Sequence, residues 1–415
     1  MPTEPAADDL NLAALLSAVE KAPPSASIDV LAAELSARIR AEEMSFLIRD
    51  LSGHSLVRLV SVGREPGAGG VQRPEEVPID QPPYSEVVRT QEPQVLAENG
   101  EIRVTAPVTN RGDAIGVLEL VLQHHPGPGI LQFVADAGLA LAYVVIANRR
   151  FTDLYEWGRR TAPFTLAAEI QHNLLPKSST CEAGQFTLAA GLEPTQDIGG
   201  DTFDYALDRN TLHVSITDAM GHEEKAALLA TLLVGALRNG RRCGLDIIHQ
   251  VQRANQAVSA HGDGDSFVTG LVLRAELATG RVRIVVAGHP LPLLLRNGEV
   301  RTVDLQTDLP FGVIGGAEYL AQRLSLEPGD RMLLLTDGML ERNAARVDVA
   351  GLLLETQSLH PREAVRSMLA AVLNATRRRL RDDATVLCLD WHGGGSRRNP
   401  PGPGEVAREA DSGLV

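Results

Sequence analysis

The chain is poor in cysteine and in lysine, and each shortage disfavours a class of protein. Its three cysteines, Cys181, Cys243 and Cys388, match neither the spacing of a zinc motif nor a disulfide framework. We therefore expect a reducing, cytoplasmic location. None of the few lysines lies in a glycine-rich phosphate loop of the Walker type, which argues against a kinase-like or ATP-using regulator.

The chain also lacks an excess of positive charge and a targeting segment. Its 39 Lys and Arg residues and 53 Asp and Glu residues give a net charge of -14, so we expect no nucleic-acid partner and no membrane partner. The first residues contain neither a positive stretch nor an apolar core, so no secretion signal is expected. The longest apolar stretch, residues 129–147, includes Gln132 and Asp136 and predicts a buried helix.

The chain contains enough apolar residues to form several hydrophobic cores. The length of 415 residues and the hydrophobic content of 44% predict two or three domains. Residues 1–26, rich in Ala, Pro and Asp, predict a flexible arm with one helix near residues 10–20. From Ile28, apolar residues recur at helical spacing, and strand-like runs and a closing helix complete a compact α+β unit. These runs are residues 45–49, 56–62, 102–108 and 116–122.

Two of these runs are joined by a turn. The segment reads Ala106-Pro-Val-Thr-Asn-Arg-Gly-Asp-Ala-Ile-Gly-Val-Leu-Glu-Leu, and its Asn and Gly suit a tight hairpin. In the order of its elements the unit resembles a GAF domain, and we assign residues 27–147 to a GAF-like sensor domain. The resemblance implies a small-molecule ligand, although the unit has no Cys or His constellation suited to haem or a bilin.

A helical linker is predicted over residues 148–178. Its apolar residues form a broken stripe that Pro163 interrupts, so we expect two helices or one kinked helix. Two interpretations stay open: packing against the chain's own domains, and a signalling helix that makes the protein a homodimer.

The remainder of the chain predicts a larger α+β domain and a tail. Residues 179–392 contain many strand-like runs, and helical patterns group at about 223–239, 245–259 and 361–375. This grouping favours a sandwich of sheets flanked by helices over an alternating doubly wound fold. Residues 393–415 are rich in Gly, Pro and charge and predict a disordered tail.

Four acidic clusters lie where the predicted strands give way to loops or helices. Taken singly, each fits a turn or a solvated strand end. Together they supply the oxygen ligands that Mg²⁺ and Mn²⁺ prefer. The clusters are Asp197-Ile-Gly-Gly-Asp201-Thr-Phe-Asp204, Thr217-Asp218-Ala-Met-Gly-His222, Leu335-Thr-Asp337-Gly338 and Arg381-Asp382-Asp383-Ala-Thr-Val.

Seven segments between Glu169 and Trp391 occur in the order found in a known phosphatase family. The chain resembles the SpoIIE/RsbU-type serine phosphatases, a bacterial branch of the PPM superfamily that includes type 2C phosphatases. The resemblance implies an αββα sandwich over residues 179–392. The segments are Ile170-Gln-His-Asn-Leu-Leu-Pro176, Gly199-Gly-Asp-Thr-Phe-Asp-Tyr205, Asp218-Ala-Met-Gly-His-Glu-Glu-Lys-Ala-Ala-Leu-Leu, Ala287-Gly-His-Pro290, Pro310-Phe-Gly-Val, Gly329-Asp-Arg-Met-Leu-Leu-Leu-Thr-Asp-Gly338 and Asp382-Asp-Ala-Thr.

The resemblance also implies a site for two divalent cations, Mn²⁺ or Mg²⁺, that share a bridging water. Asp201 and Asp218 would serve the shared site together with the main-chain carbonyl of Ala219. Asp337 and Asp382 would complete the site of the other metal. The bridging hydroxide would attack phosphorus in line and release the Ser or Thr oxygen.

Other residues near these aspartates have alternative roles. Asp383 stands beside Asp382, so either of the two could be the ligand. His222 and His289 are candidate proton donors, although a structural histidine is more common in such glycine-bounded turns. Supporting residues implied by the resemblance are Asp204, Gly200 and His222.

The chain departs from the family at two positions. Ala219 and Glu223 stand where the family most often has glycine. An alanine still presents its carbonyl, so we expect activity to survive. Asp197 and Glu341 fit solvated or structural roles better than ligand roles.

The resemblance implies a phosphorylated STAS-type anti-sigma-factor antagonist as the substrate and regulation by the GAF-like domain. A diguanylate cyclase fits less well, because Thr202-Phe203 follow Asp201 where the cyclase motif has Glu-Phe. The alternative from a different class is a non-catalytic module that keeps the phosphatase fold to bind a regulatory partner.

Overall fold

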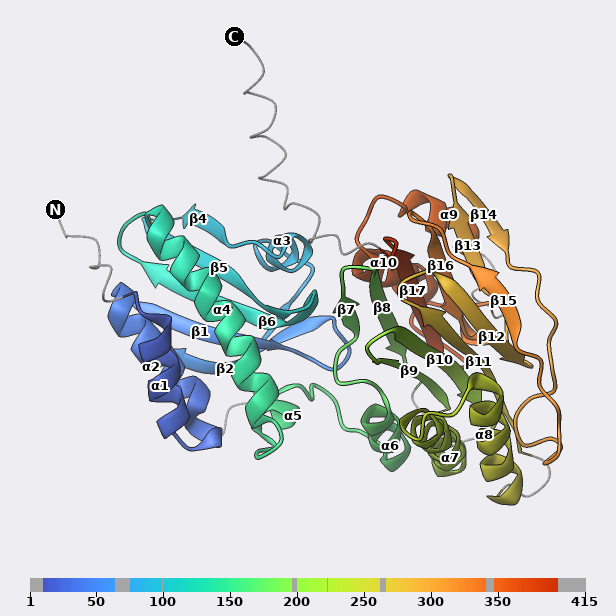
Figure 1. The fold of residues 1–415 in the computed structure, drawn as a ribbon. Helices are drawn as coiled ribbons and strands as arrows, with labels where there is room; N and C mark the ends of the chain where they lie inside the picture. The colour runs from blue at the N-terminus through green and yellow to red at the C-terminus, as the bar shows by residue number, and fades with distance from the viewer. Residues whose placement is uncertain are drawn as a thin grey trace, which may run out of the picture. The chain divides into compact units, whose positions relative to one another are not determined.

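The computed structural model divides the chain into two compact units, Met1–Pro163 and Phe164–Val415 (Figure 1). The structure describes residues 10–63, 75–98, 100–195, 200–221, 223–261, 266–340 and 347–394. The first nine residues of the predicted arm and residues 395–415 of the predicted tail lie outside these ranges.

The first unit is built on a six-stranded antiparallel sheet with the strand order β3-β2-β1-β6-β5-β4. Helices α2 and α4 pack on one face of this sheet and α1 packs against these two helices, whereas α3 packs on a smaller cluster (Figure 1). The strands are β1 (Glu43–Arg49), β2 (Ser55–Val62), β3 (Glu76–Pro78), β4 (Gln94–Glu98), β5 (Glu101–Asn110) and β6 (Asp113–Leu122). The helices are α1 (Leu12–Lys21), α2 (Ser27–Ile39), α3 (Tyr84–Thr90) and α4 (Pro128–Asn148), with a 3-10 turn η1 (Pro24–Ala26).

Apolar periodicity explains how these elements pack. Along β1, the alternate residues Met44, Phe46 and Ile48 enter the main core, as the two-residue period of a strand requires. Along α2, Leu31 and Leu35 are four residues apart and face the same core.

Helix α1 packs on the main core and does not form a flexible arm. Asn11 caps it, because its side chain accepts a hydrogen bond from the backbone N–H of Ala14 at 3.1 Å. Leu15 and Val19 are buried in the main core of the first unit. The structure therefore differs from the expectation of a loose arm over the residues of α1.

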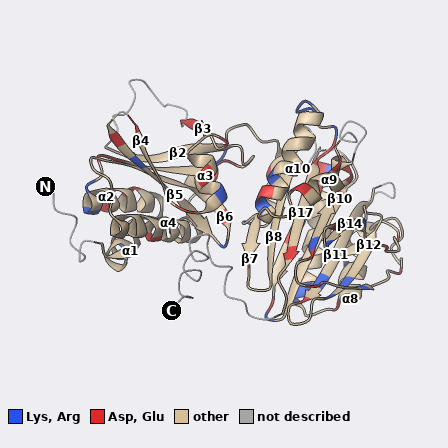
Figure 2. Ribbon diagram, turned by 90° about the horizontal axis from the view of Figure 1, so that it is seen from above, with Lys and Arg blue, Asp and Glu red and all other residues tan. Residues whose placement is uncertain are grey.

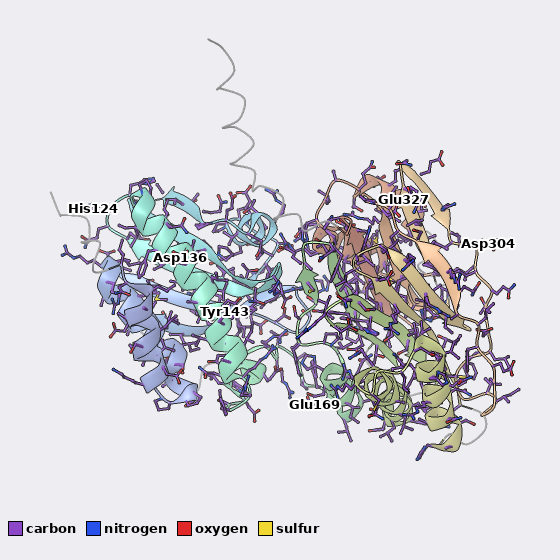
Figure 3. All side chains as sticks on the ribbon, in the orientation of Figure 1. His124, Asp136, Tyr143, Glu169, Asp304 and Glu327 are labelled. Atoms are coloured by element: carbon purple, nitrogen blue, oxygen red, sulfur yellow. The ribbon has the colours of Figure 1, made fainter. Side chains whose placement is uncertain are left out.

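Helix α4 is the one helix within the described ranges that is long and apolar enough to cross a membrane, judged by length and composition alone. Half of its most apolar 18-residue stretch is buried, and Phe133 and Leu141 lie in the main core. Asp136 is its one charged residue, so α4 is almost uniformly tan in Figure 2. Asp136 and the exposed Tyr143 are labelled on this helix in Figure 3.

The segment predicted as a linker helix contains two short helices. α5 (Leu154–Gly158) belongs to the first unit and α6 (Leu166–Leu174) belongs to the second, and the division falls after Pro163. Thr165 caps α6, since its hydroxyl accepts a hydrogen bond from Ala168 N at 3.2 Å.

The second unit contains two sheets. The five-stranded sheet has the order β15-β12-β11-β10-β9, and the six-stranded sheet has the order β14-β13-β16-β17-β8-β7. The strands are β7 (Thr180–Glu182), β8 (Phe186–Glu193), β9 (Asp201–Leu207), β10 (Thr211–Ala219), β11 (Val268–Glu276), β12 (Arg281–Ala287), β13 (Leu293–Arg296), β14 (Glu299–Thr302), β15 (Gln322–Ser325), β16 (Arg331–Leu335) and β17 (Ala384–Trp391). The helices are α7 (Glu223–Arg242), α8 (Ile247–His261), α9 (Val349–Glu355) and α10 (Pro361–Ala375), with a 3-10 turn η2 (Asp337–Met339).

Three hydrophobic cores order these elements into layers. Residues of both sheets, among them Phe186 and Trp391, form the core between the sheets. Helices α7 and α8 pack on the outer face of the five-stranded sheet through residues such as Leu233. Helices α9 and α10 pack on the outer face of the six-stranded sheet through residues such as Met368. The expected mixed α and β architecture is confirmed, with the layers in the order helix, sheet, sheet, helix (Figure 1).

Candidate functional site

Two of the predicted aspartates lie at one end of the five-stranded sheet. β9 begins at Asp201, β10 ends one residue after Asp218, and the strand register pairs these two residues directly. Phe203 on β9 and Ile216 on β10 lie in the core between the sheets. Because side chains alternate along a strand, Asp201 and Asp218 face the second sheet as well.

The second sheet brings the remaining aspartates to the same end. Asp337 begins η2 just after β16, and Asp382 lies just before β17, which is the antiparallel neighbour of β16. The charges of Asp337, Asp382 and Asp383 all raise the pKa of Asp218. These carboxylates therefore share one site.

Burial and repulsion disfavour the charged forms of the central pair. Asp201 is 1% exposed, and burial followed by the charges of Asp218 and Asp383 raises its pKa well above the usual value. For Asp218, burial and then the neighbouring carboxylates raise the pKa to about 7. Like charges directly opposite each other destabilise a sheet. A cation between the two aspartates would relieve this repulsion.

Two threonines of the six-stranded sheet hold Asp201. The hydroxyls of Thr336 and Thr385 donate hydrogen bonds to Asp201 Oδ2 at 2.7 and 2.6 Å. Thr336 Oγ1 also accepts a hydrogen bond from Thr385 N at 3.0 Å. Because all three side chains are buried, these bonds fix the carboxylate and partly offset the cost of burying its charge.

Asp382 and Asp383 have different surroundings. Asp383 is 1% exposed; its Oδ2 accepts from Gln171 Nε2 at 2.7 Å, and its Oδ1 accepts from Thr195 N at 2.8 Å and Thr195 Oγ1 at 3.2 Å. Gln171 Nε2 also donates to the main-chain carbonyl of Asp201 at 2.8 Å. Asp382 is half-buried, and its Oδ1 accepts from Asp383 N at 2.9 Å. Both oxygens of Asp383 are thus occupied by protein donors.

Two glycines let the backbone close around the carboxylates. A Cβ on Gly200 would lie 2.5 Å from the carbonyl oxygen of Ala219, and one on Gly338 would lie 2.0 Å from that of Asp383. Real side chains do not tolerate such distances. Gly200 therefore brings the start of β9 against the Ala219 carbonyl, and Gly338 brings Asp337 against the segment before β17.

These groups fit divalent cations, although they do not form a closed cage. Within the part of the chain that the structure describes, no group of three or more Asp, Glu, His or Cys side chains is placed to hold a metal ion. Mg²⁺ usually keeps several waters and uses only one or two carboxylates. The pair Asp201 and Asp218 with the Ala219 carbonyl meets that requirement. Part of the raised pKa of Asp218 comes from repulsion by the neighbouring carboxylates, which a bound cation would relieve.

Asp204 faces α7 and not the side chains of Asp201 and Asp218. It lies three residues after Asp201 on β9, so the two side chains point to opposite faces of the sheet. Its buried carboxylate pairs with Arg238 at 2.9 Å and Arg241 at 3.1 Å, both on α7. Arg238 also donates to the carbonyl of Leu174 at the end of α6. This corrects the expectation that Asp204 supports the metal ligands.

Of the two candidate proton donors, only His289 lies within the described residues. His222 lies outside them, as do Asp197 and Glu341. Burial lowers the pKa of His289 to about 4, so its ring is neutral near pH 7. Its Nδ1 lies 3.0 Å from Thr269 Oγ1. A neutral, buried ring bound to a strand residue fits a structural role better than proton donation.

Four residues that contact the carboxylates received no role from the sequence. Gln171, Thr336 and Thr385 lie inside the family-like motifs, so their places in those motifs were a usable signal. Thr195 lies in no motif, and nothing in the sequence points to it.

The raised pKa of Asp218 predicts how pH affects the metal-free protein. The folded state holds this proton more tightly than the unfolded chain, whose carboxyl titrates near 3.8. Protonation of Asp218 therefore stabilises the folded state fully below about pH 4, and this stabilisation is lost as the pH rises to about 7. In EDTA, we expect the Tm to fall more steeply between about pH 5 and pH 7.5 than in Asp218→Asn. Thermal unfolding at several pH values measures this, and equal slopes would contradict the assignment.

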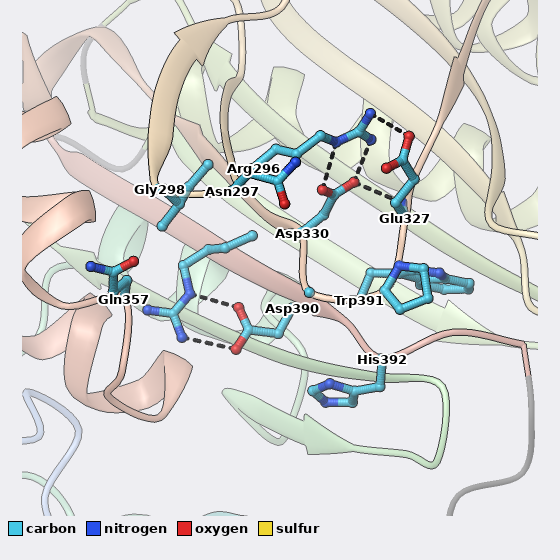
Figure 4. Close-up of a pocket in the computed structure, with 13 residues that line it drawn as sticks. Arg296, Asn297, Gly298, Glu327, Asp330, Gln357, Asp390, Trp391 and His392 are labelled. Carbon is cyan, nitrogen blue, oxygen red and sulfur yellow. Dashed lines mark hydrogen bonds and ion pairs between the residues drawn. The ribbon is translucent and has the colours of Figure 1, made fainter.

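A separate cavity of about 430 Å³ lies at the other end of the sandwich (Figure 4). Arg331, which lines it, begins β16, whereas Asp337 follows the end of that strand. Inside the cavity wall, Arg331 pairs with Asp390 at 2.6 Å and Arg296 pairs with Asp330 at 2.6 Å (Figure 4). Both arginines are thus paired with carboxylates, so neither is free to bind a phosphate.

The second unit also matches a known family in sequence. Residues 208–392 match the model of the Stage II sporulation protein E (SpoIIE) family. This range starts after Asp201 and includes Asp218, Asp337 and Asp382. Residues 208–392 are a SpoIIE-type phosphatase domain. The family expected from the ordered motifs is confirmed.

Relatives of this SpoIIE-type domain include two curated proteins of Bacillus subtilis (strain 168). Phosphoserine phosphatase RsbU is 22% identical over 234 residues, which cover 54% of this chain and 68% of RsbU. Phosphoserine phosphatase RsbP is 24% identical over 185 residues, which cover 43% of this chain and 45% of RsbP. Among solved structures, the SiaA-PP2C domain of Pseudomonas aeruginosa matches with a TM-score of 0.46 and 20% identity, over 60% of this chain and 98% of that domain.

Proposed function

We propose that this chain is a metal-dependent protein serine/threonine phosphatase of the PPM type. The observation that carries this proposal is Asp218, whose pKa is raised to about 7 by burial and by three neighbouring carboxylates at one end of the SpoIIE-type domain. Such a cluster repels a phosphate unless cations intervene. The activity named for RsbU and RsbP supports the same chemistry.

Asp201, Asp218 and the Ala219 carbonyl would hold the shared part of a binuclear centre, and Asp337 and Asp382 would complete it. Bound Mn²⁺ or Mg²⁺ supplies a water of lowered pKa and neutralises the charge of the phosphate.

Asp382 is the ligand at the start of β17, and Asp383 is a positioning residue. The oxygens of Asp383 accept hydrogen bonds from Gln171 and Thr195, whereas Asp382 is half-buried beside the site. Thr336 and Thr385 act in the same way on Asp201, which they hold against the second sheet.

The substrate is phosphoserine or phosphothreonine on a STAS-type anti-sigma-factor antagonist, in a partner-switching pathway. Residues 27–147 form a GAF-like sensor that binds a small molecule and regulates the SpoIIE-type domain through residues 148–178, which also hold a homodimer together. An antiparallel sheet with helices on one face supports the sensor assignment. The domain boundaries and the cytoplasmic location stay predictions.

The second candidate function is a non-catalytic module that keeps the phosphatase fold. It is favoured by one observation: within the described ranges the carboxylates do not converge into a ready ligand set. Metal-dependent turnover separates the two functions.

The test is hydrolysis of p-nitrophenyl phosphate by the full chain with Mn²⁺, with Mg²⁺ and with EDTA. We expect Mn²⁺-dependent turnover that EDTA abolishes, and at least about tenfold lower turnover in Asp337→Asn, because even the loss of groups that only support metal ligands costs this much. Asp337 is exposed, so the substitution leaves the fold intact. Full activity in EDTA or in Asp337→Asn would overturn the metal assignment, and no activity in the wild type on this substrate or on a phosphoprotein would favour the non-catalytic module.

A further inference from the structure

A short segment between β14 and β15 exposes several large apolar side chains. Single exposed apolar residues are normal on a protein surface, but a local group of them marks an interaction site. The side chains are Leu309 (48% exposed), Val313 (45%), Ile314 (53%) and Leu320 (47%). We call residues 309–320 the apolar loop.

The apolar loop is anchored to the core at both ends. Phe311 and Tyr319 are buried, and their ring centroids lie 5.3 Å apart. Both belong to the core formed by α7, α8 and the five-stranded sheet. The exposed side chains between them are therefore displayed on a segment that packing holds in place.

A buried asparagine fixes the tip of the apolar loop. Asn255 on α8 is fully buried, and its Oδ1 accepts a hydrogen bond from Gly312 N at 2.8 Å. Its Nδ2 donates to the carbonyls of Ile314 at 2.8 Å and Gly315 at 3.1 Å. One side chain thus satisfies three backbone groups, which sets the direction in which Val313 and Ile314 project.

The apolar loop lies beside the carboxylate site. Phe311 and Val268 exchange two backbone hydrogen bonds of 2.8 and 2.9 Å, and Val268 pairs with Ala219 in the neighbouring strand. At about 4.8 Å per strand, the backbone of Phe311 is roughly 10 Å from that of Ala219. Met220, which follows Ala219, is 51% exposed, and its backbone N–H donates to the carbonyl of Phe267, the residue before Val268, at 3.0 Å.

We propose that the apolar loop, together with Met220, is the surface on which the phosphoprotein substrate docks. A protein that places a phosphorylated side chain next to Asp218 covers the surface around it for at least 10 Å, a reach that includes this loop. The partner offers a complementary apolar patch beside its phosphorylated residue. This inference rests on the proposed phosphatase function and adds the surface that distinguishes a phosphoprotein from a small phosphate ester.

The test is a double variant, Val313→Ser with Ile314→Ser, in the full chain. Two substrates are compared with Mn²⁺: p-nitrophenyl phosphate, and a serine-phosphorylated STAS-domain protein that the wild type dephosphorylates. We expect kcat/KM on the phosphoprotein to fall about tenfold or more through KM, because the double variant removes apolar surface that the contact would bury. Turnover of p-nitrophenyl phosphate, which is too small to reach the loop, changes less than about twofold.

Leu207→Ser is the matched control. Leu207 is 43% exposed and ends β9, the strand that begins at Asp201, so it lies at the far end of the sheet. We expect it to leave both substrates unaffected. Docking on the apolar loop is overturned if the double variant keeps the wild-type KM for the phosphoprotein, if both substrates lose activity equally, or if Leu207→Ser has the same effect. Dissociation of a wild-type dimer by the double variant would instead assign the loop to a second copy of the chain. A wild type that hydrolyses neither substrate would overturn the phosphatase function itself.

Discussion

Asp218→Asn is expected to lower Mn²⁺-dependent turnover by at least about a hundredfold, the upper range for the loss of groups that merely support metal ligands. The amide has the same shape as the carboxylate but carries no charge, so it binds a divalent cation poorly. In the metal-free protein the same change removes the repulsion between Asp218 and Asp201, which face each other across two strands. We therefore expect the Tm in EDTA to stay the same or to rise.

This opposite response of activity and stability separates a metal ligand from a structural residue. Turnover of p-nitrophenyl phosphate and thermal unfolding in EDTA measure the two effects on the same preparation. Asp304→Asn is the control, because Asp304 is an exposed carboxylate of the same unit (Figure 3). A variant of Asp218 that unfolds much more readily than the wild type would indicate that the carboxylate holds the fold and not a metal.

The second large effect is expected from Asp383→Ala compared with Asp382→Ala. Removing the Asp383 carboxylate leaves the buried donors of Gln171 and Thr195 without their acceptor. Each such group costs about 1–3 kcal/mol. Relief of the repulsion with Asp382 offsets part of this cost, so we expect a net loss of about 2 kcal/mol in the free energy of unfolding.

Asp382→Ala is expected to weaken activation by Mn²⁺ and to leave the stability of the fold almost unchanged. Asp382 is half-buried, so its loss changes the free energy of unfolding by less than about 1 kcal/mol while it weakens Mn²⁺ activation of turnover. Urea unfolding in EDTA and Mn²⁺ titration of activity measure the two variants side by side. If Asp382→Ala is the less stable variant and Asp383→Ala binds Mn²⁺ more weakly, then the two roles are exchanged.

The sequence predicted that four aspartates stand at strand ends, because such positions depend on local signals. Asp201, Asp218, Asp337 and Asp382 each stand at a strand end that apolar alternation marks, and their motifs occur in family order. Asp204 was misjudged because a motif does not say which face of a strand a residue occupies, and a three-residue offset reverses the face.

The partners of Asp383 could not be read from the sequence. Its carboxylate is bound by Gln171 and Thr195, which lie 212 and 188 positions away along the chain. Such hydrogen bonds depend on how two sheets and a helix pack together, and no local sequence pattern predicts that packing. The contact is therefore a product of tertiary packing alone.

The fold was predictable in its long elements and not in its short ones. Helices α7, α8 and α10 follow apolar periodicities of many residues and were expected close to their observed bounds. Strands β13, β14 and β15 have four residues each, which is too few to establish a period. A helix was expected near residues 10–20, where α1 lies, but the surrounding Ala and Pro residues gave no sign that Leu15 and Val19 are buried.

The close backbone approach at Gly200 and Gly338 gives a criterion for judging related chains. An alanine at either position would place its Cβ within 2.5 Å of the carbonyl oxygen of Ala219 or Asp383. A homologue could keep every aspartate and still be unable to bring its strand ends this close if it replaced these glycines. Among relatives with an intact set of acidic residues, the two glycines therefore discriminate between a working centre and a degenerate copy of it.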